Sequence, residues 1–233
     1  MNFSWKKDPF DTKIILLNTA KINSIKSIDV IPLLIKDLKE SGIEYASYRL
    51  PSTQMKMAQN LERLGFLLVD GSINFEASPE EIVIGDYDSI FEASESDGER
   101  LREISGSAFT STRFFNDPAI SKEKAQNIYK EWITNSLVGY ADKVFVYKKE
   151  GKVLGYVTVK DRHIQLIAVE TSQQGKGIGK KLIWAAIAHL KNRNLDKIFI
   201  ETQVQNIKAI RAYTKCGFKV VDTFFTFRIL IEI

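Results

Sequence analysis

The clearest chemical signature is a run of three alternating glycines in residues 171–182, TSQQGKGIGKKL, which follows the apolar segment IQLIAV. Glycine lets the backbone adopt positive φ and approach a ligand closely, so successive N–H groups can converge on anionic oxygens. A helix that begins here would add partial positive charge, and Lys176 and Lys180 would add long-range attraction. The spacing therefore predicts a diphosphate site. A glycine-rich helix start that binds no ligand is the alternative.

Two common nucleotide-binding loops do not fit this segment. The Walker A loop, G-x-x-x-x-G-K-[ST], would need a glycine at Gln174 and a hydroxyl at Lys181. The dinucleotide fingerprint G-x-G-x-x-G, counted from Gly175, would need a glycine at Lys180. The pattern that does fit is Q-x-x-G-x-G, from Gln174 to Gly179.

A second motif lies downstream, where NIKAIRAYTKCGF at 206–218 reads N-x-x-[AS]-x-x-x-Y-x-x-x-G-F. With the Q-x-x-G-x-G loop between a strand and a helix, this motif resembles the GNAT family of acyl-CoA N-acyltransferases over about residues 100–227. The resemblance implies that acetyl-CoA is the co-substrate, that the glycine loop binds its pyrophosphate, and that the preceding strand bonds its pantetheine arm. The cofactor-binding residues implied are Ile167, Ala168, Val169, Gln174, Gly175, Lys176, Gly177, Ile178, Gly179, Lys180 and Asn206.

The same resemblance places Tyr213 beside the cofactor's sulfur. Acetyl transfer to an amine needs a proton for the departing thiolate. A tyrosine of ordinary pKa, about 10, stays protonated at neutral pH and can donate to a thiolate whose conjugate acid has a pKa of about 8.5. Asn206 and Tyr213 are seven residues apart, two helical turns, so one helix face can present both. Tyr213 is thus the predicted general acid; a core aromatic is the alternative.

Two residues are candidates for the base that accepts the amine proton. His163 begins the strand before the glycine loop, where several members of the family have a glutamate base, and histidine can accept a proton near neutral pH. Glu201 on the next strand is the rival. A chain of water molecules to bulk solvent could also carry the amine proton away. Cys216 is a weaker candidate, as a nucleophile, because the sequence shows no partner histidine for it.

The acceptor is expected to bind the segment at about 95–140, which resembles that of a family member that acetylates the amino group of a nucleotide-linked amino sugar. Arg113 could pair with a phosphate, and Phe114 or Phe115 could stack on a base or sugar. A salt bridge between Arg113 and Asp117, with both aromatics in the core, is the alternative. An amino acid, a polyamine or a protein N-terminus are other acceptors, and a non-catalytic CoA-binding module is the alternative of another class.

The predicted elements that hold these residues include a strand–helix–strand–helix series, at 163–169, 179–192, 196–204 and 206–217. Upstream, the pattern predicts helices at about 99–108 and 121–137, a loop at 93–100, and a hairpin at 143–160 that turns at Glu150-Gly151. Further upstream it predicts a helix from Asp29 to Gly42, a strand at 43–50, a helix at 52–65 and two strand pieces around Asp70 and Gly71.

A shift of 152 residues superimposes residues 54–75 on residues 206–227, with identities that include Gly65/Gly217 and Phe66/Phe218. Two unrelated helix ends would give part of this likeness, because glycine followed by an apolar residue commonly ends a helix. We predict an α/β fold of the α+β type: the acyltransferase fold with a splayed, mixed, mostly antiparallel sheet. An N-terminal half-unit (1–80) would resemble the C-terminal part of the catalytic domain (81–233).

The composition agrees with a soluble enzyme. Of the 233 residues, 44% are hydrophobic and 27% charged, and no apolar run is long enough to span a membrane. A single cysteine suits a reducing compartment, so we expect a cytoplasmic protein. The net charge of +4 comes from scattered lysines, which argues against a nucleic-acid partner. The expected partner is a small-molecule amine, without membrane or metal; a homodimer is left open.

Overall fold

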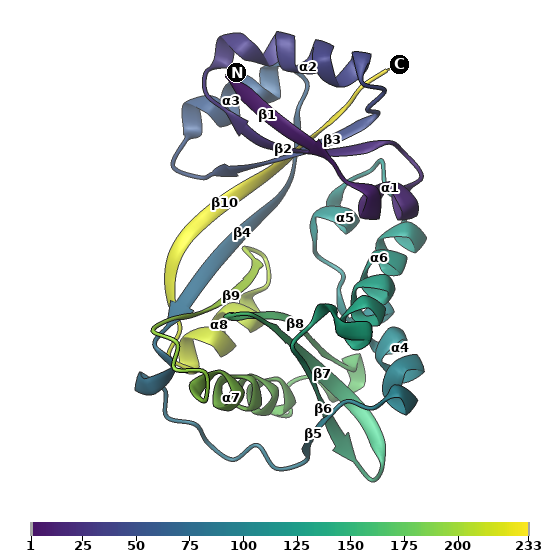
Figure 1. Ribbon diagram of the computed structural model, residues 1–233. Helices are drawn as coiled ribbons and strands as arrows, with labels where there is room; N and C mark the ends of the chain where they lie inside the picture. Colours follow the sequence, from purple (N-terminus) through teal and green to yellow (C-terminus); the bar gives the residue numbers. More distant parts are fainter. Residues whose placement is uncertain (1, 233) are drawn as a thin grey trace. The chain divides into compact units, whose positions relative to one another are not determined.

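The computed structural model describes residues 2–232 (Figure 1). Its strands are β1 (Phe3–Lys7), β2 (Thr19–Ile25), β3 (Tyr45–Pro51), β4 (Leu67–Ala77), β5 (Ile90–Glu92), β6 (Lys143–Lys149), β7 (Lys152–Lys160), β8 (His163–Val169), β9 (Ile198–Gln203) and β10 (Lys219–Leu230). Its α-helices are α1 (Pro9–Ile15), α2 (Ile31–Glu40), α3 (Met55–Arg63), α4 (Gly98–Ala108), α5 (Arg113–Asn116), α6 (Lys122–Asn135), α7 (Ile178–Lys191) and α8 (Ile207–Lys215). Antiparallel pairs outnumber parallel ones, which confirms the predicted mixed sheet.

The chain folds as two compact units. Unit 1 contains the described parts of Met1–Ser72, Thr112–Lys124 and Asp222–Ile233, and unit 2 contains Ile73–Ser111 and Ala125–Val221. The division differs from the predicted boundary at residues 80 and 81, because the segment 112–124 and the end of the chain belong with the N-terminal residues. β4 and β10 each contribute residues to both units.

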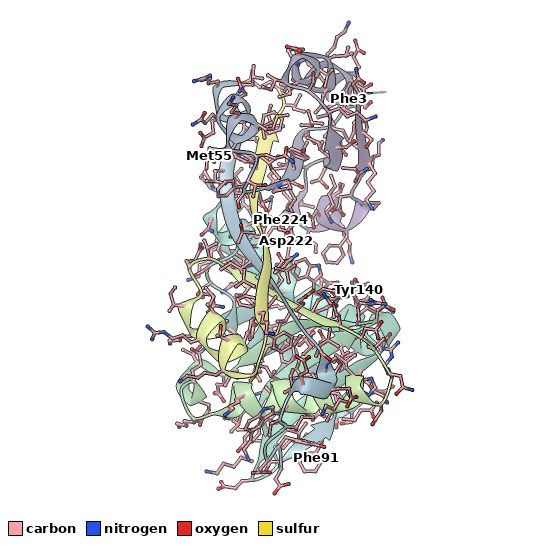
Figure 2. The ribbon with its side chains drawn as sticks, turned by 90° about the vertical axis from the view of Figure 1, so that its left-hand side faces the viewer. Phe3, Met55, Phe91, Tyr140, Asp222 and Phe224 are labelled. Carbon is pink, nitrogen blue, oxygen red and sulfur yellow. The ribbon has the colours of Figure 1, made fainter. Side chains whose placement is uncertain are left out.

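Unit 1 has the strand order β1-β2-β3-β10-β4, in which β2 and β3 are parallel and β3 and β10 antiparallel. α2 and α3 cover it with apolar faces, and Ile31, Leu34 and Leu38 of α2 are all fully buried at helical spacing. Phe224 lies on β10 (Figure 2). The guanidinium of Arg49 lies over its ring, 4.2 Å from the centroid.

The segment 112–124 joins unit 1 through a buried carboxylate. Asp117 is 1% exposed, and it accepts hydrogen bonds from the Tyr45 hydroxyl at 2.9 Å and from Nε of Arg228 at 3.1 Å. Arg113 of the same segment donates to Oδ2 of Asp11 at 2.8 Å. Buried charges need such partners, so these contacts account for why the segment folds with unit 1.

Unit 2 has the strand order β4-β9-β8-β7-β6-β5, with a parallel pair, β8 and β9, among antiparallel neighbours (Figure 1). α7 packs on β6, β7 and β8, and α4 packs on β7 and β8. The two helices use opposite faces: Val157 of β7 belongs to the core under α7, and its neighbour Tyr156 belongs to the core under α4. Unit 2 therefore has one core on each side of the strands that surround the glycine loop.

The two halves of the chain repeat one series of elements. β2, α2, β3, α3 and β4 correspond in order to β8, α7, β9, α8 and β10, and each series opens with a parallel strand pair. The helix ends also match: Gly65 and Gly217 have φ of 87° and 93°, and the N–H of Phe66 and of Phe218 bonds a carbonyl of the last helical turn. The likeness seen in the sequence thus extends to the whole strand–helix series.

Candidate active site

The glycine loop has the backbone conformation that its sequence predicts. Gly175 and Gly177 have φ of 81° and 84°, and α7 begins at Ile178 directly after them. A Cβ at either glycine would meet open space, so the positive φ is what requires glycine. The side chain of Gln174 turns back, and its Nε2 donates to the carbonyl of Val169 at 3.3 Å. The loop is therefore tied to the end of β8.

The backbone of this loop presents a row of free hydrogen-bond donors. Within residues 2–232, the N–H groups of residues 175–179 have no protein acceptor. Residues 175–177 are also exposed to solvent, so the open space beside them can admit a ligand. Unbonded N–H groups at the start of a 14-residue helix are well suited to the oxygens of a pyrophosphate.

The two predicted loop lysines contact neighbours in the structure. Nζ of Lys176 donates to the side-chain oxygen of Gln173 at 2.9 Å, and Nζ of Lys180 lies 4.3 Å from the ring centroid of Trp184. Both lysines are exposed, so solvent and salt screen the electrostatic part of these contacts. Their part in cofactor binding stays a prediction.

β8 and β9 separate beside the loop. They pair only at His163 with Phe199 and at Ile164 with Ile200, and within the described chain residues 165–169 have no partner in β9. Ile167, Ala168 and Val169 remain paired with β7 on their other edge, after an irregularity in the β7–β8 register at 165–166. One backbone edge of these predicted cofactor residues therefore faces a gap between two parallel strands, which suits an extended pantetheine arm.

Asn206 and Tyr213 lie at the start and near the end of α8, in the same unit as the glycine loop. Oδ1 of Asn206 accepts the N–H of Ala209 at 3.2 Å and so caps the helix. The Tyr213 side chain is 7% exposed and meets the ring of Phe75 edge to face at 5.7 Å. Burial raises the pKa of the Tyr213 phenol above its ordinary value. The phenol is thus held protonated.

The two candidate bases lie on the other face of the strands. The ring of His163 stacks on Phe199 at 5.3 Å, and Glu201 follows Phe199 at the two-residue spacing that repeats a strand face. Ile200, between them, belongs to the core that contains Tyr213. The predicted acid and the two candidate bases therefore lie on opposite faces of the β8–β9 pair. His163 and Glu201 are both exposed, and neither role is decided by this geometry.

The predicted acceptor segment is divided between the units. Arg113, Phe114 and Phe115 belong to unit 1; Phe114 is 1% exposed, Phe115 is half-buried, and the Arg113 guanidinium lies 3.9 Å from the Phe114 ring centroid. In unit 2, Phe109 stacks on Tyr129 at 4.3 Å. The alternative to substrate binding was a salt bridge between Arg113 and Asp117. Arg113 does form a salt bridge, but its partner is Asp11. Its binding of a substrate phosphate stays a prediction.

Sequence reasoning missed two features of unit 2. Thr202 is buried and accepts a hydrogen bond from the side chain of Asn206. The only signal in the sequence was its position one residue after Glu201. Gly85, in the segment between β4 and β5, packs so tightly on Trp184 of α7 that a Cβ would lie 2.4 Å from the indole. The sequence offers no periodic pattern in that segment that would place it against α7.

Residues 2–232 contain no cluster of three or more histidine, cysteine, aspartate or glutamate side chains arranged to hold a metal ion. Over the same residues, no helix has the length and apolar character required to cross a bilayer.

Comparisons with known proteins show the family of the chain. The model of the acetyltransferase (GNAT) family matches residues 99–218, which is more than half of the chain. The match contains the glycine loop, the β8–β9 pair and the whole of α8, and it ends at Phe218.

Two curated relatives align over longer stretches. The spore coat polysaccharide biosynthesis protein SpsD of Bacillus subtilis is 31% identical over 137 residues, which cover 57% of this chain and 47% of that protein. The dTDP-fucosamine acetyltransferase of Escherichia coli O6:H1 is 27% identical over 170 residues, which cover 70% of this chain and 71% of that protein. The chain thus spans about half the length of the first relative and more of the second.

A solved structure, that of a GCN5-related N-acetyltransferase from Sphaerobacter thermophilus, matches the fold with a TM-score of 0.70. The alignment covers 100% of this chain and 78% of that one at 12% sequence identity. At this identity the likeness concerns the fold alone.

Proposed function

Since the chain belongs to the acetyltransferase (GNAT) family, we propose that it transfers an acetyl group from acetyl-CoA to a primary amine, most readily on a nucleotide-linked amino sugar. The amine attacks the thioester directly, without an acyl-enzyme. Cys216 suits a nucleophile poorly because it is 4% exposed and burial raises the pKa of its thiol, which disfavours the thiolate.

The observation that most supports the proposal is the row of free N–H groups at residues 175–179, beside the open edge of β8. In the proposed complex the loop binds the pyrophosphate, and the edge at 167–169 bonds the pantetheine arm. Bound acetyl-CoA supplies the activated acyl group. Held at several points along its length, it would present the thioester in one orientation, which is a main source of rate enhancement in two-substrate reactions.

The proposed chemistry uses one proton transfer on each side of the gap. A C–N bond forms between the amine and the thioester carbon, and the C–S bond breaks. Tyr213 donates its phenol proton to the departing thiolate, and the resulting phenolate recovers a proton from solvent. The amine's surplus proton leaves to His163, to Glu201 or to water, on the opposite strand face. Atoms and charges balance without a metal or a redox step.

The preference for an amino sugar is supported by the two relatives, one named for spore coat polysaccharide biosynthesis and one for acetylation of dTDP-fucosamine. In this chain, a stacked pair, Phe109 and Tyr129, and a T-shaped pair, Tyr129 and Trp132, provide aromatic surface in the predicted acceptor segment. Aromatic faces of this kind suit the apolar face of a sugar ring or a base. We also propose that the enzyme works in the cytoplasm.

The acceptor preference is tested by thioester consumption with purified protein, acetyl-CoA and a panel of amines. We expect kcat/KM for a nucleotide-linked amino sugar to exceed that for free lysine, spermidine or a peptide N-terminus about 100-fold, because a site built to hydrogen-bond its substrate rejects analogues that leave those groups unpaired. Equal or higher kcat/KM with one of the other amines would reassign the acceptor. Binding of acetyl-CoA without turnover of any amine would favour a non-catalytic CoA-binding module.

A further inference from the structure

The side chain of Arg100, on α4, contacts three other parts of unit 2. Its Nε donates to the carbonyl of Val153 on β7 at 3.2 Å, and its Nη1 donates to Oε2 of Glu103 on the same helix at 2.8 Å. Its Nη2 lies 2.7 Å from Oε2 of Glu170, the residue that directly follows β8. The guanidinium therefore links α4 to the end of the strand that precedes the glycine loop.

The contact between Arg100 and Glu170 is an ion pair shielded from water. Nη2 of Arg100 and Oε2 of Glu170 are both closed to solvent, although the two side chains as wholes are 27% and 26% exposed. Within residues 2–232 neither atom has a hydrogen-bond partner, so charge holds the pair together. Such attraction is stronger where water is excluded, and a carboxylate left there without its cation is unfavourable. Loss of Arg100 would therefore release the Glu170 side chain.

Glu170 is the residue from which the glycine loop departs. Its N–H donates to the carbonyl of Leu154 on β7 at 2.8 Å, and its own carbonyl accepts the N–H of Gln173, also at 2.8 Å. This turn ends two residues before Gly175, so the position of Glu170 sets where the loop begins. Glu170 is also the acidic residue nearest to residues 175–179 in the sequence, because the next one is Asp196. Its charge opposes the binding of an anion by those residues unless a cation neutralises it.

We propose that Arg100 is a positioning residue for acetyl-CoA: by holding the Glu170 carboxylate against α4, it fixes the start of the glycine loop and neutralises a negative charge beside the pyrophosphate site. The inference rests on the proposed function, because it concerns the cofactor that the loop is proposed to bind. Arg100 acts through Glu170 and takes no part in the proposed proton transfers.

The test is a double-mutant cycle with Arg100→Gln and Glu170→Gln, measured as the dissociation constant for acetyl-CoA. We expect Arg100→Gln alone to weaken binding about tenfold, and Glu170→Gln alone to change it less than about threefold. In the Glu170→Gln background, Arg100→Gln should cost less than about twofold, because the carboxylate that needs a partner is already absent. At saturating acetyl-CoA, kcat should stay within about twofold of the wild type in all three variants.

The dependence on salt separates an electrostatic effect from a loss of packing. Salt screens the repulsion between Glu170 and the cofactor, so the deficit of Arg100→Gln relative to the wild type should shrink as the ionic strength rises. A deficit that stays constant with salt would overturn the neutralising role. Arg100→Lys keeps the charge, so it should bind within about threefold of the wild type even if Arg100→Gln does not fold, and a tenfold loss would overturn the same role.

Arg193→Gln is the matched control. Nη1 of Arg193 donates to Oδ2 of Asp142 at 2.7 Å and to the carbonyl of Asp161 at 2.8 Å, so it too contacts a carboxylate and a carbonyl within unit 2. It follows the last residue of α7, whereas the glycine loop precedes the first, and a helix of 14 residues is about 21 Å long. Both variants lose one positive charge, and only Arg100→Gln should weaken the binding of acetyl-CoA.

Three results would refute the inference or the function beneath it. Unchanged affinity in Arg100→Gln, or an equal loss with and without the Glu170 carboxylate, would overturn the positioning role and leave the proposed function intact. A wild-type protein that binds no acetyl-CoA would instead refute the proposed function, and the inference with it.

Discussion

Replacing Tyr213 with phenylalanine is expected to lower kcat for acetyl transfer about 100-fold or more, which is the usual contribution of a positioned general acid. Affinity for acetyl-CoA should change less than about threefold, because the predicted contacts with the cofactor come from the loop, from β8 and from Asn206. Burial raises the pKa of Tyr213, so the wild-type phenol stays protonated throughout the neutral and moderately alkaline range. Steady-state kinetics and calorimetry on the same preparations give both quantities.

Tyr45→Phe is the matched control for this variant. Tyr45 is 1% exposed and its hydroxyl donates to Asp117 at 2.9 Å, but it belongs to unit 1. Both variants lose a buried hydroxyl, at a cost of about 1–2 kcal/mol in stability, and only Tyr213→Phe should lose turnover. Wild-type kcat in Tyr213→Phe would rule out the acid assignment and leave Tyr213 as a core aromatic.

Replacing Gly177 with alanine is expected to weaken acetyl-CoA binding about 10- to 100-fold. The residue precedes α7 with φ of 84°, a conformation that costs a non-glycine residue about 1–3 kcal/mol. Relief of that strain would turn the N–H groups of residues 175–179 away from a common ligand. A Cβ would also project into the open space beside the loop. The dissociation constant from calorimetry is the measurement.

Gly151→Ala separates loss of the binding loop from general backbone strain. Gly151 turns the β6–β7 hairpin with φ of 76°, and a Cβ there also meets open space. The two variants should be destabilised by similar amounts, while Gly151→Ala binds acetyl-CoA like the wild type. If Gly177→Ala bound acetyl-CoA with unchanged affinity, the loop would not be the pyrophosphate site.

The sequence specified the catalytic half of the chain well, because local patterns there agree with the tertiary fold. β8 has the predicted bounds of 163–169, and the hairpin turns at Glu150 and Gly151, both with positive φ. The glycine loop falls directly before α7. In these places the apolar periodicity and the turn chemistry predict the same element.

Elements that depend on distant partners were predicted less well. Asp70 and Gly71 resemble a turn, yet β4 runs through them as one strand, since it lies between β10 and β9 and neighbouring strands outweigh local propensity. β1, α1 and β2 were not predicted from the N-terminal residues. The segment at 112–124 folds with unit 1 because Asp117 is bonded there by Tyr45 and Arg228, both remote in sequence.

In the candidate site, too, local motifs were predicted and tertiary contacts were not. Motif spacing was enough to propose Gln174 to Gly179, Asn206 and Tyr213 as residues of one site, and all of them lie in unit 2. The hydrogen bond between Asn206 and the buried Thr202 depends on the packing of α8 against β9, so it could be recognised only in the folded chain. The division of the acceptor segment between two units likewise depends on tertiary contacts.

We propose that each chain has one acetyl-CoA site, built on the glycine loop of unit 2. Calorimetric titration of the wild-type protein with acetyl-CoA tests it most directly. We expect one site per chain with a dissociation constant between about 1 μM and 1 mM, the usual range for enzyme substrates. Absence of binding at millimolar acetyl-CoA would contradict the claim, and a stoichiometry of two would show that the N-terminal half-unit binds the cofactor as well.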